Sequence, residues 1–369
     1  MNYLPVKPSQ VVVITGASAG VGRAAAHRFA QAGFSIGLIA RDGTALQEVR
    51  DEVEKLGGRA IVLPLDVADA DAVFAAADRV AATFGQIDVW VNDAMVTVFS
   101  PLWKMTPDEF RRVTGVTYLG FVHGTMAALR HMRPANRGSI IQIGSALAYR
   151  GIPLQSAYCG AKHAIRGFTD SLRAELIHDR SAINLTMLQL PAVNTPQFDW
   201  ARAHMRRSPR PVAPVVEPEL IADVVFRAAN KPAREYWIGL STLKLILGNM
   251  IMPKFLDSYL AKVCIGGQQT EHPIGPDRID NLYQPVHSLH RTRGSFSAES
   301  GTTALLAPGS LSRWVPYAAT VLGGAALGLF FALNRPQKQL QRAQRKRPFR
   351  GGRHVRQVVL SRNSDRWSG

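Results

Sequence analysis

The stretch VVVITGASAGVGRAAAHRF, residues 11 to 29, joins an apolar run to a glycine-rich turn and then to an alanine-rich segment. The run VVVIT is typical of a strand that is buried on both faces of a sheet. Gly16, Gly20 and Gly22 follow where the backbone must bend and where a phosphate can approach the first amides of a helix. A plain tight turn is the alternative interpretation, but the position between a strand and a helix predicts a dinucleotide-binding site.

Short apolar runs of the same kind recur along the first 240 residues, separated by segments with helical spacing. One helical segment precedes Gly57-Gly58 and another precedes Gly85, as expected for helices that end at glycine. Alternating strands and helices imply right-handed crossovers. We therefore predict an α/β fold in residues 1–240, a Rossmann-like doubly wound parallel sheet with helices on both faces. Seven strands are expected, at residues 11–15, 34–40, 60–66, 87–92, 139–144, 183–190 and 235–239.

The composition is that of a globular protein, because 46% of the 369 residues are hydrophobic and 19% are charged. The two cysteines, Cys159 and Cys264, provide neither a disulfide framework nor a metal-ligand spacing, so no metal site is expected. The N-terminus lacks the charged and then apolar pattern of a secretory signal. We therefore expect a cytoplasmic catalytic domain.

The end of the second strand reads IARD, residues 39–42. An acid at this position usually binds the ribose hydroxyls of NAD, whereas the 2′-phosphate of NADP requires a cation. Arg41, together with Ser18 in the glycine loop, could bracket that phosphate. The sequence therefore favours NADP(H) over NAD. Asp42 either pairs with Arg41 or starts the next helix, and the sequence leaves both interpretations open.

Several short motifs occur one after another along the chain, and together they point to one protein family. TGASAGVG at residues 15–22 resembles the T-G-x-x-x-G-x-G cofactor loop of the short-chain dehydrogenase/reductase family, and Leu65-Asp66-Val67 resembles the stretch with its adenine-contacting acid. Ser145 and YCGAK at residues 158–162 resemble its active-site serine and Y-x-x-x-K motif. The resemblance covers roughly residues 8 to 240 and implies an NAD(P)-dependent enzyme acting on CH–OH groups. With Ser18 and Arg41, the expected cofactor contacts are Gly16, Gly20, Val21, Gly22, Asp66, Val67, Asn92, Tyr158, Lys162, Val193 and Thr195.

Tyr158 and Lys162 are four residues apart, so they share one face of a helix. A free phenol has a pKa of about 10, and a nearby ammonium lowers it towards neutral pH. The resemblance implies that Tyr158 exchanges a proton with the substrate oxygen while hydride moves between substrate and nicotinamide. It also implies that Ser145 hydrogen-bonds this oxygen and that Lys162 holds the nicotinamide ribose.

Two positions depart from the family pattern. The family's N-N-A-G reads Asn92-Asp93-Ala94-Met95, so a bulky thioether replaces a glycine near the expected cofactor ribose. The active-site asparagine of the V-N-x-x-G context is replaced by Thr117. Threonine could still hold a water for proton relay, but it lacks the fixed donor and acceptor of an amide. We therefore include Thr117 among the candidate catalytic residues.

The stretch LPAVNTPQFDW, residues 190–200, resembles the family's nicotinamide-contacting segment, although Pro191-Ala192 replaces the commoner Pro-Gly. Val193 and Thr195 are the candidates for the carboxamide contact. Phe198, Trp200, Met205 and the proline-rich residues 208–219 are typical of a mobile substrate lid. Its aromatic residues either bind a lipophilic substrate or only pack the lid.

Beyond residue 240 the alternation of strands and helices ends. Residues 241–263 are expected to form an apolar helical extension, packed on the sheet or lying at a membrane surface. Residues 264–312 are rich in Gly, Pro, Ser and His, and we interpret them as a loosely ordered linker or cover. A membrane helix is predicted at residues 313–334, and residues 335–369 are expected to form a basic tail.

Trp314 to Leu333 carries no charge, and a helix of that length spans the roughly 30 Å hydrocarbon core of a bilayer. Residues 314–333 are therefore predicted to be a membrane helix, with a buried amphipathic helix as the alternative. One span cannot keep both the basic tail and the catalytic domain in the cytoplasm, so the topology stays open. The tail holds most of the excess behind the +17 charge. We expect it to meet anionic lipid rather than nucleic acid.

The leading hypothesis is an NADP(H)-dependent oxidoreductase that interconverts an alcohol and a carbonyl on a lipophilic small molecule, associated with a membrane. The alternative is a catalytically impaired protein of the same fold that senses nucleotides or acts as a scaffold at a membrane. Met95 and Thr117 motivate this alternative. The family resemblance also implies a homo-oligomer.

Overall fold

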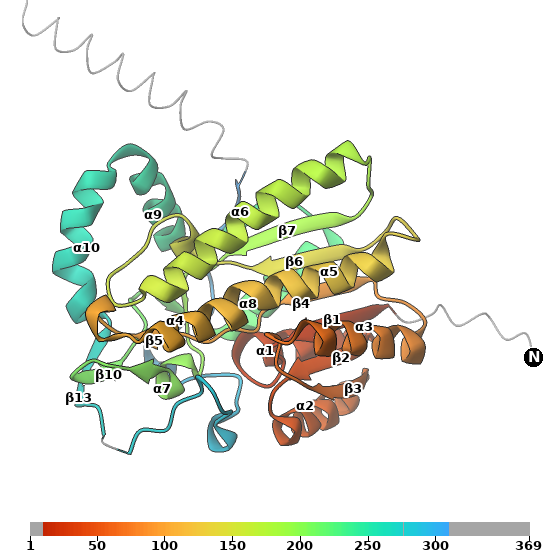
Figure 1. Cartoon of the computed structure of the whole chain (residues 1–369), viewed down its shortest axis with the longest axis horizontal. Helices are drawn as coiled ribbons and strands as arrows, with labels where there is room; N and C mark the ends of the chain where they lie inside the picture. Colours follow the sequence, from red (N-terminus) through yellow and green to blue (C-terminus); the bar gives the residue numbers. More distant parts are fainter. Residues whose placement is uncertain (1–9, 276, 310–369) are drawn as a thin grey trace, which may run out of the picture. The chain divides into compact units, whose positions relative to one another are not determined.

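The computed structural model describes residues 10–275 and 277–309, which build an eight-stranded sheet with helices on both faces (Figure 1). The strand order is β15-β12-β7-β6-β4-β1-β2-β3, and only β15 runs antiparallel to its neighbour. The predicted Rossmann-like α/β sheet is confirmed. The seven expected strands are β1 Val11–Thr15, β2 Ser35–Ala40, β3 Arg59–Pro64, β4 Val89–Asn92, β6 Ser139–Ile143, β7 Asn184–Gln189 and β12 Glu235–Ile238.

Each face of the sheet has its own apolar core, because successive side chains of a strand point to opposite faces. Val12 and Ile14 of β1 pack with helices α1 (Gly20–Ala30), α2 (Gly43–Lys55) and α8 (Pro218–Asn230). Val11 and Val13 lie in the other core, with helices α3 (Ala70–Phe84), α5 (Gly120–Met132) and α6 (Ser156–His178). The strands are therefore apolar throughout, which is why they are visible in the sequence.

Strand β1 lies between β2 and β4, where the strand order reverses. In open sheets of this kind, ligands bind in the crevice beyond the carboxyl ends of the strands at this point. Shorter elements flank the sheet: β5 Val98–Phe99, η1 Leu102–Lys104, α4 Pro107–Val113, η2 Thr114–Leu119, η3 Ala146–Ala148, β8 Ala192–Val193, α7 Gln197–Trp200, β9 Arg202–Ala203, β10 Arg207–Pro209 and β11 Val215–Val216.

Residues 241–275 and 277–309 belong to the same compact unit as the sheet. Helices α9 (Leu240–Ile251) and α10 (Pro253–Gly267) form the helical extension. Three strands follow and pair with earlier ones: β13 (Gln269–Pro273) with β10, β14 (Ser300–Gly301) with β11, and β15 (Leu306–Pro308) with β12. Two short turns, η4 (His287–Leu289) and η5 (Ser297–Glu299), lie between them.

The structure thus differs from the prediction of a loosely ordered linker at 264–312 over the residues that it describes there. The difference arises because this segment is held by strand pairing and main-chain hydrogen bonds, which leave no periodic apolar pattern in the sequence. The predicted membrane helix at 314–333 and the basic tail at 335–369 lie outside the described residues. Within the described residues, none of the helices combines the length and the apolar character needed to span a bilayer.

Candidate active site

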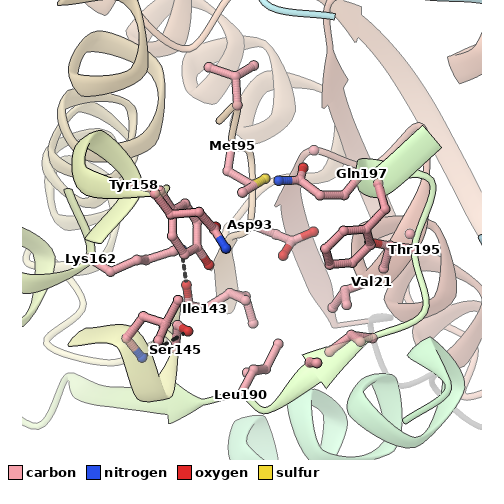
Figure 2. A pocket seen from close by; sticks show the side chains of 18 of the residues that line it. Val21, Asp93, Met95, Ile143, Ser145, Tyr158, Lys162, Leu190, Thr195 and Gln197 are labelled. Carbon is pink, nitrogen blue, oxygen red and sulfur yellow. Dashed lines mark hydrogen bonds between the residues drawn. The ribbon is translucent and has the colours of Figure 1, made fainter. Parts of the chain in front are cut away.

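A continuous pocket of about 660 Å³ runs along the carboxyl ends of the strands. Its catalytic end is formed by Ser145, Tyr158 and Lys162, and Figure 2 shows these three side chains together. Its loop end is formed by Gly20 and Arg41 with their neighbours in the glycine loop and at the end of β2. One cavity therefore joins the expected cofactor loop to the expected catalytic residues.

The glycine loop has a shape that side chains would block. Gly16 and Gly20 have φ angles of +76° and +56°, a region that L-residues other than glycine rarely adopt. A Cβ atom on Gly22 would lie 2.3 Å from the carbonyl oxygen of Gly16. The Thr15 hydroxyl accepts hydrogen bonds from the backbone N–H groups of Asp93 and Ala94, at 3.0 and 3.2 Å. This ties the loop to the end of β4 and leaves Val21 and Ser18 lining the pocket.

The catalytic end combines two elements that are consecutive in the chain. Ser145 follows β6, and its backbone N–H donates to Gln189 Oε1 at 3.1 Å. Tyr158 and Lys162 lie one turn apart on α6, and Ser145 interacts with the Tyr158 phenol closely enough to lower its pKa. Lys162 is 2% exposed, and its Nζ donates to the carbonyl of Ile143 at 2.6 Å (Figure 2). The three predicted catalytic side chains are therefore brought together.

The electrostatics differ from our prediction for Tyr158. Burial raises the pKa of its phenol above the ordinary value, and only the hydrogen bond with Ser145 acts in the opposite direction. The negative charge of Asp93 raises this pKa further. The Lys162 Nζ lies 5.5 Å from the centroid of the Tyr158 ring. The expected lowering of the Tyr158 pKa is therefore not found, because burial of the phenol is the dominant influence on it.

Asp93 is a site residue that the sequence reasoning missed. Figure 2 shows its carboxylate in the pocket between Lys162 and Val21. Desolvation raises its pKa to about 7, opposed by Lys162 and by a hydrogen bond from the Gly22 N–H. Burial likewise lowers the pKa of Lys162 to about 8, opposed by Asp93. The available signal was an acid within the N-N-A-G segment, where we assigned Asn92 to the cofactor and noted Met95, which also lines the pocket.

Thr117 does not have the predicted role. It is fully buried, and its hydroxyl donates to the carbonyl of Val96 at 2.7 Å. The same oxygen accepts from the Val96 N–H at 3.0 Å. Because Thr117 is also not among the pocket-lining residues, it braces the segment after β4 and does not face a substrate.

Asn92, predicted to contact the cofactor, is likewise turned into the protein interior. Its Oδ1 accepts from Trp90 Nε1 at 2.8 Å, and its Nδ2 donates to Thr125 and Gln142 at 3.1 and 3.0 Å. The residue is fully buried and does not line the pocket. It therefore connects β4 with α5 and β6, and the neighbouring Asp93 is the residue that reaches the pocket.

At the loop end, Arg41 and Asp66 line the pocket but already have partners. The Arg41 guanidinium donates to the main-chain carbonyls of Asn281 at 2.5 Å and Tyr283 at 2.8 Å. Asp66 pairs with Arg112. Asp42 accepts from the Ala45 N–H at 3.1 Å as the N-cap of α2, which settles the alternative that the sequence left open. Val67 lies beside Asp66 in the pocket wall.

The far wall is largely apolar. Val193 and Thr195 line the pocket as expected, and so do Phe198 and Trp200 of the predicted lid, whereas Met205 does not. Helices α9 and α10 add a wall that the sequence reasoning did not assign to the site. Its apolar residues are Leu245, Leu256, Tyr259, Leu260, Val263 and Cys264, and the polar residues Ser241, Thr242 and Lys244 of α9 line the pocket as well.

Comparison with known proteins agrees with this geometry. The sequence profile of the short chain dehydrogenases matches residues 10–205. An uncharacterized oxidoreductase of Bacillus subtilis, YxnA, is 31% identical over 283 residues, which cover 76% of this chain and 80% of the relative. A fatty acyl-CoA reductase of Acinetobacter baylyi is 29% identical over an aligned region that covers 61% of this chain and 75% of the reductase.

A solved structure is similar as well. A metagenomic short-chain oxidoreductase in complex with NADP superposes with a TM-score of 0.51 at 32% identity, covering 61% of this chain and 92% of that one. The chain therefore belongs to the short-chain dehydrogenase/reductase family. It is an NAD(P)-dependent oxidoreductase of that class.

The residues of the pocket fit a dinucleotide. The glycine loop forms a cradle that a Cβ on Gly16 or Gly22 would fill, at 2.9 Å from the Ala94 backbone and 2.3 Å from the Gly16 carbonyl oxygen. The loop leads directly into the N-terminus of α1, whose first amides favour phosphate. A cation, Arg41, stands at the loop end, and an ammonium, Lys162, stands at the catalytic end.

Proposed function

We propose that this protein is an NADP(H)-dependent oxidoreductase that interconverts an alcohol and a carbonyl on a lipophilic substrate. The observation that carries the proposal is the meeting of Ser145, Tyr158 and Lys162 in one pocket with the glycine loop. The phenol of Tyr158 and the hydroxyl of Ser145 both line the pocket and interact closely enough for Ser145 to lower the pKa of the phenol, so a substrate oxygen could contact both groups.

NADPH, when bound, supplies the hydride. Tyr158 is the proton donor to the substrate oxygen in the direction of reduction, because burial keeps its phenol protonated. Ser145 donates a hydrogen bond to the same oxygen and stabilises the charge that develops there. Lys162 is held in place by the Ile143 carbonyl, and its remaining N–H groups would be available to hold the ribose of a bound cofactor.

The preference for NADP(H) is supported by Arg41 at the end of β2, where an acid would favour NAD. The similar metagenomic oxidoreductase was solved with NADP. The Arg41 guanidinium has five N–H donors, and its contacts with the carbonyls of Asn281, Leu282 and Tyr283 involve only the two terminal nitrogens. Donors therefore remain for a phosphate.

The proposed lipophilic substrate is supported by the wall from α9 and α10. Leu256, Leu260 and Val263 face the pocket together with Phe99 and Phe198. Apolar surface of this kind favours alkyl or ring systems over sugars or charged acids. The fatty acyl-CoA reductase among the relatives acts on a long apolar chain by name, which is consistent with such a wall.

The test is turnover by the purified full chain. We expect NADPH oxidation with aldehydes and ketones, with kcat/KM rising as the alkyl chain lengthens, because each buried methylene adds roughly 0.8 kcal/mol of apolar burial. NADH serves as the matched control cofactor. NADPH binding without oxidation across the whole panel would support the nucleotide-sensing alternative and contradict the enzyme proposal.

A further inference from the structure

Residues 278–296, which we call the strap, cross the loop end of the pocket. Within residues 278–296 the structure has one regular element, the single turn η4. Four of the strap residues line the pocket: Asn281, Pro285, Val286 and His290. The strap is therefore a wall of the same cavity, supplied from a part of the chain far from the glycine loop.

The strap is fixed to this end of the pocket through its main chain. The Gly20 N–H donates to the Arg291 carbonyl at 3.0 Å, and Arg23 Nη1 donates to the His290 carbonyl at 3.0 Å. Gly294 lies so close to the segment after β8 that a Cβ atom there would meet the Thr195 carbonyl oxygen at 2.4 Å. A dinucleotide that follows the glycine loop to Arg41 must therefore pass beneath the strap.

Two strap side chains present polar atoms to the pocket without using them. Asn281 is 8% exposed, and its Oδ1 has no hydrogen-bond partner among the described residues. The His290 side chain is 7% exposed, and both ring nitrogens lack a hydrogen bond of acceptable geometry within the described chain. Its Nε2 lies 3.0 Å from Asp42 Oδ2, a close contact that lacks hydrogen-bond geometry. Buried polar atoms of this kind are rare unless a ligand or water completes them.

We propose that Asn281 and His290 are dinucleotide-contacting residues and that the strap closes over the bound cofactor. This inference rests on the proposed function. Asn281 Oδ1 is an acceptor, suited to an adenine amine or a ribose hydroxyl. Burial lowers the pKa of His290, so its neutral ring offers one donor and one acceptor to a phosphate oxygen or a hydroxyl.

The outer contacts of the strap are weak. Arg291 pairs with Asp199 at 2.7 Å and Arg293 pairs with Glu219 at 2.9 Å, and both arginines are about half exposed. Exposed ion pairs of this type contribute little to stability. The strap is therefore held mainly by its main-chain contacts with Gly20, Arg23 and Arg41 at the loop end of the pocket.

The experiment is a titration of the full chain with NADPH, followed by tryptophan fluorescence and calorimetry. His290→Ala and Asn281→Ala should each raise the Kd about tenfold, as expected for the loss of a hydrogen bond to a polar or charged group. His287→Ala is the matched control, because His287 also contacts Asp42 at 2.6 Å but its side chain is 75% exposed and does not line this pocket. Its Kd should stay within about twofold of the wild-type value.

Two further readouts separate ligand contact from a structural role. His290→Gln should recover most of the lost affinity, because an amide also supplies a donor and an acceptor. The melting temperatures of the cofactor-free variants verify that each one folds. NADPH should also slow amide hydrogen exchange in residues 281–291.

The outcomes that overturn the inference are distinct. Unchanged Kd values for both alanine variants, or faster amide exchange in the strap on NADPH binding, would show that the strap is not part of the cofactor site. If the wild-type chain binds neither NADPH nor NADH, the proposed function fails and the inference fails with it. If the wild-type chain binds NADPH and both alanine variants bind it equally well, only the proposed role of the strap is overturned.

Discussion

The two ends of the pocket are built in different ways. At the catalytic end, Ser145, Tyr158 and Lys162 come from one short stretch of chain and meet through their side chains. At the loop end, Arg41 and Gly20 meet residues 281–291, about 240 to 270 positions later, largely through main-chain carbonyls. Side-chain chemistry is encoded in residue types, whereas a carbonyl is available at every residue. The catalytic end is therefore predictable from the sequence, whereas the contacts of residues 281–291 with the loop end are not.

This contrast predicts the largest effect at the catalytic end. Tyr158→Phe should lower kcat by about 10² to 10⁴-fold, because it removes the proton donor. The Kd for NADPH should change by less than about twofold, because the ring remains and the loop end is untouched. Steady-state kinetics and a binding titration check both values. Retained turnover would mean that another group donates the proton.

A smaller effect is expected at the loop end. Arg41→Ala should weaken NADPH about tenfold, because it removes a charged partner of the 2′-phosphate. It also removes the contacts with the carbonyls of Asn281 and Tyr283, so NADH should weaken slightly too. Titration of the variant and the wild type with both cofactors gives the loss of affinity for NADPH relative to that for NADH. Arg50→Ala, a change at an arginine on the surface of α2, is the control. Equal losses for NADPH and NADH would contradict the 2′-phosphate assignment.

The smallest expected effect concerns Asp93, between the two ends. Its pKa of about 7 means that the folded chain keeps a proton that the unfolded chain releases near pH 4, at about the ordinary value. Stability should therefore fall as pH rises from about 4 to 7. Lys162, whose pKa is lowered to about 8, changes the stability only at higher pH. Between about pH 8 and 10.5 it should make stability rise with pH.

Asp93→Asn should remove the fall in stability between about pH 4 and 7, because asparagine is neutral at every pH. At neutral pH the variant should melt about 3 °C above the wild type. Melting curves across this range provide the measurement. Asp71→Asn, at an exposed carboxylate in the first turn of α3, should keep the wild-type profile. If the variant and the wild type show parallel profiles, the proton is not held by Asp93.

Several site assignments from the sequence needed correction because the position of a residue in a motif does not show which way its side chain points. Asn92 ends strand β4, and Thr117 lies in the helical segment η2. In the structure both turn inward and satisfy buried backbone or amide groups. Asp93 turns into the pocket instead. A shift of one residue along an extended segment exchanges the two faces, so motif position alone does not determine the side.

The direction of the Tyr158 pKa shift illustrates a second limit. The one-turn spacing of Tyr158 and Lys162 correctly placed their side chains near each other. Burial, however, disfavours the phenolate, and Asp93 adds a negative charge nearby. Desolvation depends on everything that surrounds the ring, and no local pattern reports it.

The amino-acid sequence by itself determined the glycine loop, the seven parallel strands and the serine, tyrosine and lysine of the catalytic end. These features depend on local rules: the period of apolar residues, the conformational freedom of glycine and the spacing of side chains along one helix. Only the tertiary structure decided the eighth strand, the apolar wall from α9 and α10, the strap over the loop end and the protonation of the buried groups. Those features arise from main-chain hydrogen bonds and burial between distant segments, which any sequence of suitable polarity can provide.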